Sequence, residues 1–255
     1  MKEIDIYKLL PGKNCKECSA GTCMAFALKL NKMPSLLDEC PYMEEQKRDY
    51  LKANLTVSDW RDSLIESLRK EVSQMEFKDI APDLGAHCQE DGLIIRCIGR
   101  EFIIKRDGTI LPDTENKWIK ILLLHYIRTR GKGNFTGKWI SFSDIKGGLV
   151  KASTFQRDCE NPLKEIFDLN PEQAIKVLER LGGKRIEGYP SEIAITIDLL
   201  PKVRILILYS KGDDEFPSAL KILFDAITPE FLDVESIIFL IEGFVHTANH
   251  FVADY

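Results

Sequence analysis

The chain has 255 residues, of which 44% are hydrophobic and 29% are charged, and its formal net charge at pH 7 is -5. A chain of this length and composition can bury a sizeable core, with room for one larger domain and one small domain. The negative net charge argues against a general nucleic-acid-binding protein, because the chain as a whole does not attract a phosphate backbone.

The N-terminus and the cysteine content favour a cytoplasmic location. Met1 to Asp5 contain no cleavable apolar signal, and the most apolar later run, residues 119–127, is too short and too interrupted to span a bilayer. The chain has seven cysteines, an odd number, and four of them are clustered. This usage is typical of metal ligation and free thiols in a reducing compartment, and not of a disulfide framework.

The N-terminal part of the chain carries four cysteines with the spacing C-x2-C-x4-C-x16-C. They are Cys15, Cys18, Cys23 and Cys40. Four thiolates gathered in this way are what an iron–sulfur cluster needs. A tetrahedral zinc site uses the same ligands, but it more often comes as two matched C-x2-C pairs, and only the first pair here has that form. The spacing therefore favours an iron–sulfur cluster over zinc.

The segments around the cysteines predict short helices and pinned loops. Residues 4–10 are apolar enough for one or two helical turns, which Pro11 and Gly12 end. Residues 20–32 contain strong helix formers, so Cys23 should lie near a helix N-terminus, where unpaired N–H groups and the helix dipole stabilise an anionic cluster. Pro34 should end this helix, and Pro41 should fix the exit path behind the last ligand. We expect a cluster-binding domain over residues 1–55.

The run from Pro11 to Pro41 resembles the small [4Fe-4S] domain of the large subunit of the corrinoid iron–sulfur protein family. Similar domains occur in subunits of membrane-associated electron-transfer complexes. The resemblance implies that Cys15, Cys18, Cys23 and Cys40 hold one [4Fe-4S] cluster. The chain departs from the family pattern at Lys16, where the family usually has glycine. We expect this change to affect turn strain or the local field, and not ligation.

The remainder of the chain resembles a prokaryotic family of unassigned activity that often carries this iron–sulfur domain in front. The resemblance rests on four short runs, at residues 124–126, 137–142, 181–183 and 212–217. It implies an architecture and no activity. The chain is therefore expected to consist of a cluster domain over residues 1–55 and an α+β domain over residues 56–255.

Residues 44–76 contain neither glycine nor proline and predict two helices with a break at residues 54–57. The second helix should be capped by Ser58 and should bury one apolar stripe. The stripe consists of Trp60, Leu64, Ile65, Leu68 and Val72. We expect packed helices between the domains in place of a flexible tether.

Helix and strand signals alternate through the larger domain. Residues 79–92 indicate a polar loop, and residues 93–98 and 101–105 indicate two strands that form a hairpin around Gly99. A helix over residues 115–129 should begin behind Thr114 as its N-cap, and residues 139–142 indicate a short strand.

The C-terminal half continues this mixture. Helices should start at Asn161-Pro162 and at Asn170-Pro171, and Gly182-Gly183 should end the second one. Residues 193–200 and 203–209 are rich in branched side chains and predict adjacent strands. Asp233 should cap a final amphipathic helix. The predicted fold class is α+β, with a small helical and loop domain followed by a larger mixed domain.

His246 and His250 are candidate cofactor ligands. With Glu242 they form a line at i, i+4 and i+8 on one face of the final helix, a geometry that can offer imidazoles to a metal or a tetrapyrrole. The more common interpretation is that this face is simply the polar side of an amphipathic helix.

The remaining candidates have ordinary explanations as well. Cys88, Cys97 and Cys159 are better explained as buried or idle thiols than as a second metal centre built on His87-Cys88. His125 lies in an apolar helix and is expected to be a satisfied core histidine and not a ligand, since nothing near it in the sequence suggests a partner. Residues 213–215 are three carboxylates that form either a cation site or an ordinary acidic turn.

Three functional hypotheses follow from the sequence. The phosphate-loop and dinucleotide spacings are not met, and no nucleophile elbow, catalytic triad order or H-E-x-x-H motif occurs, so whether the chain is an enzyme is left open. The first hypothesis is a [4Fe-4S] protein that transfers one electron to or from a protein redox partner in anaerobic metabolism. The second is a corrinoid or other tetrapyrrole carrier, with the cluster as its reductant. The corrinoid motif D-x-H-x-x-G is absent, so binding would be base-off without that ligand or would use His246 or His250. The third is an interaction module with a structural cluster.

Overall fold

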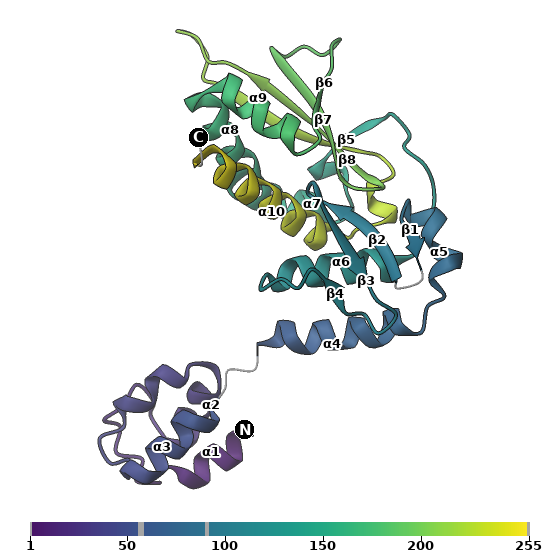
Figure 1. Cartoon of the computed structure of the whole chain (residues 1–255). Coiled ribbons are helices and arrows are strands. Elements are labelled where there is room, and N and C mark those ends of the chain that lie inside the picture. Colours follow the sequence, from purple (N-terminus) through teal and green to yellow (C-terminus); the bar gives the residue numbers. More distant parts are fainter. Residues whose placement is uncertain (1, 56–58, 90–91, 254–255) are drawn as a thin grey trace. The chain divides into compact units, whose positions relative to one another are not determined.

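The fold comes from a computed structural model that describes residues 2–55, 59–89 and 92–253. The chain divides into two compact units, Met1–Ser63 and Leu64–Tyr255, and the division falls inside helix α4 (Trp60–Ser73) (Figure 1). The domain boundary expected after residue 55 stays a prediction, and the predicted cap Ser58 lies outside the described residues.

The smaller unit is built from short helices. They are α1 (Glu3–Leu9), α2 (Cys23–Lys32), a 3-10 helix (Pro34–Glu39) and α3 (Glu45–Asn54). Ile6 of α1 and Phe26 and Leu30 of α2 are buried together in its core. Pro34 does end α2, but it also occupies the first turn of the 3-10 helix, which the sequence analysis did not predict. Proline suits that position because its missing N–H would be unpaired there anyway.

Helix α4 buries most of the predicted apolar stripe. Ile65, Leu68 and Val72 are buried, and Leu64 packs partly against them. Trp60 was wrongly assigned to the stripe, because its side chain is 61% exposed. It is the first residue of the helix, and the buried contacts begin one turn later.

The polar loop predicted over residues 79–92 is wrong. The segment forms helix α5 (Phe77–Leu84) and strand β1 (His87–Gln89). Phe77, Ala81 and Leu84 are spaced i, i+4 and i+7 and are buried on one helix face, which outweighs the helix-breaking tendency of Pro82. Gly85 then ends the helix in the left-handed conformation, with φ of 63°.

The predicted hairpin is confirmed as β2 (Gly92–Cys97) and β3 (Arg100–Ile104), paired antiparallel with Cys97 opposite Arg100. Both turn residues have positive φ, 47° at Ile98 and 75° at Gly99. A β-branched residue rarely adopts this conformation. The buried Ile98 is held there because its N–H donates to Leu199 O at 2.9 Å. With β1 and β4 (Ile110–Leu111), the hairpin forms the four-stranded sheet β1-β2-β3-β4 among the described residues.

One predicted helix start needs correction. Helix α6 (Lys117–Thr129) is capped by Asn116, whose side chain accepts from Trp118 N–H and Ile119 N–H, and not by Thr114. Helix α8 (Asn161–Leu169) begins at Asn161-Pro162 as predicted. The sequence did not reveal that a π-helical turn, Gln156–Glu160, joins α8 to α7 (Gly148–Phe155) in one helical run. Pro162 is tolerated because the wider turn before it already interrupts the normal hydrogen-bond ladder. Asn170 does cap α9 (Pro171–Arg180), as predicted.

The second sheet has the order β5-β9-β8-β7-β6 in the part of the chain that the structure describes, and every neighbouring pair in it is antiparallel. Its strands are β5 (Trp139–Ser141), β6 (Lys184–Arg185), β7 (Ile193–Leu200), β8 (Val203–Ser210) and β9 (Ala219–Asp225). The adjacent strands β7 and β8 are as predicted. Strand β9 was missed.

Helix α10 (Val234–Ala253) completes the core of the larger unit. The Asp233 side chain accepts from Ser236 N–H at 2.8 Å, which confirms the predicted cap. Helix α10 contacts α6, α8 and α9, and Figure 1 shows α8, α9 and α10 together beside β7 and β8. Short 3-10 turns at Phe142–Asp144 and Thr228–Glu230 complete the elements. The architecture is the expected mixed α+β fold. None of the described helices is long and apolar enough to cross a membrane.

Candidate metal centre

The first two candidate ligands lie in a loop with unusual backbone conformation. Asn14 and Lys16, the neighbours of Cys15, both have positive φ, 47° and 64° respectively. Asparagine tolerates this left-handed region, but a lysine there is strained relative to glycine. The two left-handed residues turn the chain sharply on either side of Cys15, so that Cys15 and Cys18 reach the same space.

Asn14 also links this loop to α2. Its side-chain oxygen accepts the Cys23 N–H at 2.8 Å, and Thr22 Oγ1 accepts the Ala25 N–H at 3.1 Å. Two of the N–H groups at the helix N-terminus are thus paired within the protein, which corrects the expectation that they are unpaired. The positive end of the helix dipole still lies at Cys23, the first residue of α2. The sequence analysis missed Asn14, although an asparagine just before the first cysteine is a usual turn former.

Cys40 follows the 3-10 helix and is held by its backbone. Its carbonyl accepts from Arg48 Nη2 at 2.8 Å, and Arg48 Nη1 pairs with Asp38 at 3.0 Å. Its side chain is only 5% exposed, and the Cys23 side chain is also buried. Cys15 and Cys18 are half-buried.

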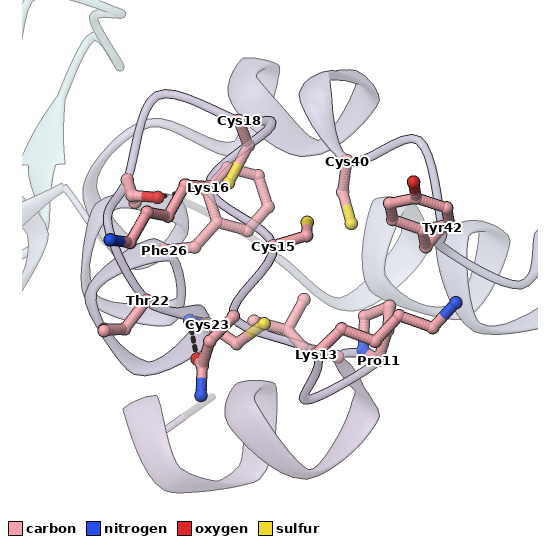
Figure 2. A pocket seen from close by; sticks show the side chains of 13 residues that line it. Pro11, Lys13, Cys15, Lys16, Cys18, Thr22, Cys23, Phe26, Cys40 and Tyr42 are labelled. Atoms are coloured by element: carbon pink, nitrogen blue, oxygen red, sulfur yellow. Dashed lines mark hydrogen bonds between the residues drawn. The ribbon is translucent and has the colours of Figure 1, made fainter.

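All four cysteines line one pocket (Figure 2). The other walls include the apolar side chains of Leu10, Ala20 and Phe26. Figure 2 shows the four sulfur atoms directed toward a shared space between the loop, α2 and the end of the 3-10 helix. The structure therefore brings together residues that are up to 25 positions apart in sequence, from Cys15 to Cys40.

The thiols also affect one another electrostatically. Burial raises the pKa of the Cys40 thiol, the Tyr42 backbone N–H lowers it, and the charges of Cys18, Cys23 and Cys15 raise it further. Four thiolates this close repel one another, and a cationic metal centre would remove the repulsion.

The donor set and its surroundings fit an iron–sulfur cluster. Iron–sulfur clusters are held by four thiolates, and the pocket supplies four thiols. Among the described residues, no three His, Cys, Asp or Glu side chains are grouped to hold a metal ion. The four thiols nevertheless line one shared space.

Charged and aromatic side chains form the rim of the pocket. Lys13 Nζ lies 4.1 Å from the centre of the Tyr42 ring, and the Tyr42 hydroxyl donates to Glu17 Oε1 at 2.9 Å. This bond raises the pKa of Tyr42, followed by the charge of Glu17. Lys13 and Lys16 both line the pocket, so positive charge is placed beside the four cysteine side chains.

The candidate ligands on the last helix belong to the larger unit. His246 and His250 are both exposed on α10 in the larger unit, and Glu242 of the same line is half-buried. Burial raises the pKa of Glu242, and the charge of Asp158 adds to this. The role of the two histidines as cofactor ligands stays a prediction.

His125 has partners that the sequence did not reveal. Its Nδ1 lies 3.2 Å from Ser236 Oγ, and its Nε2 lies 3.5 Å from Asp233 Oδ2. Burial lowers the pKa of His125, and the charge of Asp233 opposes this shift. These contacts confirm the prediction of a satisfied histidine. No partner could be found near it in the sequence, because α6 and α10 are distant in sequence and adjacent in space.

The other thiols are dispersed. Cys88 is exposed on β1, whereas Cys97 and Cys159 are buried. Burial raises the pKa of the Cys97 thiol to about 12, so it stays protonated and unreactive at neutral pH.

In two polar loops of the larger unit, backbone N–H groups donate to an aspartate side chain of the protein itself. Asp213 Oδ1 accepts the N–H groups of Glu215 and Phe216 at 2.9 and 2.7 Å, which is the pattern of an ordinary acidic turn. In the glycine-rich loop before β5, Thr136 N–H and Gly137 N–H donate to the buried Asp225 carboxylate at 3.0 and 2.9 Å. Those N–H groups are therefore unavailable to a phosphate.

Comparison with protein families accounts for most of the chain. Residues 76–247 match the family described as "Domain of unknown function (DUF3786)". The chain belongs to this family. In addition to the DUF3786 domain, residues 10–42, which include all four clustered cysteines, match the family described as "Putative Fe-S cluster".

The curated relatives match only a short part of the chain. The corrinoid/iron-sulfur protein large subunit of Moorella thermoacetica is 48% identical over 50 residues, which are 20% of this chain and 11% of that protein. The acetyl-CoA decarbonylase/synthase complex subunit gamma of Methanocaldococcus jannaschii is 50% identical over 44 residues, 17% of this chain and 9% of that protein. The same subunit of Methanothermobacter thermautotrophicus is 44% identical over 48 residues, 19% and 10% of the two chains.

The chain thus spans about a tenth of the length of these relatives. No solved structure matches it.

Proposed function

We propose that this protein is an iron–sulfur protein that holds one [4Fe-4S] cluster on Cys15, Cys18, Cys23 and Cys40 and exchanges single electrons with a protein partner. The observation that carries the proposal is the shared pocket that all four cysteines line. When bound, such a cluster supplies a one-electron redox centre whose potential depends on nearby charge, hydrogen bonds and exposure.

The chain's own residues prepare the pocket for this role. Asn14 fixes the loop against the N-terminus of α2, and Arg48 holds the Cys40 carbonyl. Leu10, Ala20 and Phe26 exclude water from one side. Lys13 and Lys16 place positive charge at the rim, which favours electron uptake by stabilising added negative charge.

A protein partner is proposed because the named relatives are subunits. Several relatives are called subunits of an acetyl-CoA decarbonylase/synthase complex. A small redox unit of this kind, attached to a second unit, is suited to passing electrons between proteins.

No observation favours a corrinoid site in this chain. The similarity to the corrinoid/iron-sulfur protein covers 20% of the chain, and His246 and His250 are exposed. The electron-transfer proposal is therefore the one that we develop.

The first test is the metal content of protein purified without oxygen. We expect about four irons and about four acid-labile sulfides per chain, with a broad visible absorption that a strong reductant bleaches. One tightly held zinc per chain and no colour would contradict the proposal. A cluster that forms but stays inert between a strong reductant and a mild oxidant would favour a structural role instead.

A matched pair of cysteine variants tests the ligand set. Cys18→Ala should lose the cluster, because three thiolates remain for four ligand positions. Cys88→Ala removes an exposed cysteine of the larger unit and should keep the full iron content. Equal iron content in the two variants would show that the ligands were assigned wrongly.

A further inference from the structure

The larger unit contains a cavity that has no part in the iron–sulfur proposal. Its volume is about 390 Å³, and it lies between α4, the turn that joins β3 to β4, and α6. Its lining includes Ile65, Arg69, Ile110, Asp113, Lys120 and Leu124. Cavities of this size are large enough for a small molecule.

Arg69 is held in place at one side of this cavity. Its Nε donates to Gly108 O at 3.1 Å and its Nη2 donates to Thr109 Oγ1 at 3.2 Å. A Cβ at Gly108 would lie 2.9 Å from Arg69 Cα, so the turn is pressed directly against α4. These two bonds use two of the five guanidinium donors and fix the direction of the plane. Arg69 is thereby a cation with a preset orientation and spare donors.

Lys120 supplies the second cation of the cavity. Its Nζ lies 2.8 Å from Asp113 Oδ1. The Lys120 side chain is 27% exposed, whereas the Asp113 side chain is 78% exposed. The hydrogen bond from Lys120 is the largest cause that lowers the pKa of Asp113, and the charge of Arg69 lowers it as well. The two cations therefore act on the same region. The lining of the cavity contains two cations and one carboxylate, Asp113, and the charge of Asp107, which lies outside the lining, also acts on Arg69.

A net positive charge in a partly apolar recess is costly unless an anion joins it. The apolar lining, Ile65, Ile110 and Leu124, excludes water from the other side of the cavity. We propose that this cavity binds a small amphipathic oxyanion, with a carboxylate or phosphate group between Arg69 and Lys120 and an apolar tail against Ile65, Ile110 and Leu124. This site goes beyond the cluster proposal and does not depend on it.

Calorimetric titration of the full-length protein tests the site with two defined probes, hexanoate and hexyl phosphate. At least one should bind saturably with a dissociation constant below about 1 mM, a level that a ligand of this size can reach. The amide NMR signals of Gly108 and Thr109 should shift during the same titration. The two probes distinguish a carboxylate ligand from a phosphate ligand, and inorganic phosphate, which has no tail, should bind more weakly than hexyl phosphate.

Three variants should change the affinity for the probes in different directions, according to the role proposed for each residue. Lys120→Met keeps the length of the side chain and should weaken binding about tenfold. Arg69→Gln should also weaken it, although it can disturb the turn. Asp113→Asn should tighten binding a few-fold, because it removes the competing carboxylate and frees Lys120. A purely structural salt bridge would not produce this gain.

Lys132→Met is the matched control. Lys132 also pairs with an aspartate, at 3.9 Å from Asp83, but it lies outside the cavity, so its loss should leave the affinity unchanged. The absence of saturable binding of both probes up to about 10 mM would overturn the proposal. Equal affinity in the wild type, Lys120→Met and Asp113→Asn would also overturn it. These two variants still test the proposal if Arg69→Gln fails to fold.

Discussion

The two units of the chain reach a buried core in different ways. Among the described residues, twelve buried side chains form the core of the smaller unit, and two of them, Cys23 and Cys40, are proposed cluster ligands. The core of the larger unit runs from α4 through both sheets to α10 and consists of branched and aromatic side chains such as Ile195, Ile205 and Phe244. Its central strands β7 and β8 are buried along most of their length.

This difference links folding to metal binding in one unit and not in the other. A domain this small buries little apolar surface and usually needs additional stabilisation, such as a bound metal or disulfide bonds. Two of the proposed ligands are themselves core residues. Loss of the metal would therefore remove a stabilising cross-link and leave thiol groups that repel one another when ionised inside the core. The larger unit has no such dependence, so the two units should respond differently to the same perturbation.

Removal of iron should produce the largest difference. A chelator applied under reducing conditions should unfold the smaller unit and leave the larger unit folded, because only the smaller unit depends on ligation for much of its folding free energy. Limited proteolysis should then cut between about residues 10 and 45 and leave a stable fragment from near residue 50 to Tyr255. These positions assume the predicted two-domain division.

The untreated holoprotein is the control for this experiment. Equal resistance of the apoprotein and the holoprotein across residues 10–45 would show that ligation does not hold the smaller unit together. Loss of the large fragment would show that the two units do not fold independently.

A matched pair of core truncations sharpens the comparison. Leu30 of α2 and Leu199 of β7 are both fully buried. Leu199→Ala should lower the free energy of unfolding of the larger unit by about 2–5 kcal/mol and leave the iron content unchanged. Leu30→Ala should instead lower iron retention, because the pocket and the core are made by the same helix. Denaturant unfolding followed by far-UV circular dichroism and iron analysis measures both. Iron loss in the Leu199 variant would argue against independent units.

Lys16→Gly should have a smaller and stabilising effect. Lys16 has φ of 64°, where glycine avoids the cost that a side chain imposes. After allowing for the greater freedom of glycine in the unfolded chain, we expect a gain of about 0.5 kcal/mol, seen as slower iron release to a chelator. Lys13→Gly is the control, because Lys13 is not one of the described residues with a positive φ. This substitution should lower the stability of the smaller unit. A loss of stability on Lys16→Gly would mean that the lysine side chain contributes more than its strain costs.

The smallest expected effect is a pH dependence of the larger unit. The pKa of His125 is lowered by burial from its usual value of 6.5, so the unfolded chain binds a proton that the folded chain does not. The contribution of His125 is then fully present above pH 6.5 and is lost as the pH falls toward its folded pKa. Denaturant unfolding between pH 7.5 and 5.5 should show this decline, and His125→Gln should reduce it. An unchanged slope in the variant would assign the decline to other groups.

Local signals in the sequence were sufficient for several features. The cysteine spacing singled out four residues that line one pocket, Asp233 identified the start of α10, and the strand signals around Gly99 identified the β2–β3 hairpin. In these cases the responsible side chains lie within a few residues of one another or follow a fixed spacing. The α+β class followed from the same alternation of local signals.

Tertiary packing decided the features that the sequence analysis missed or misassigned. Pro82 and the polar residues near it indicated a loop, but burial of Phe77, Ala81 and Leu84 against the larger core makes this segment a helix. The partners of His125 come from another helix, 108 and 111 residues away. The cavity of Arg69, Asp113 and Lys120 joins three separate segments. The sequence by itself determined those elements, and the cysteine spacing, that depend on local interactions. Burial and charge pairing between distant segments were decided only by how the chain packs, because their free energy arises from contacts that no local pattern encodes.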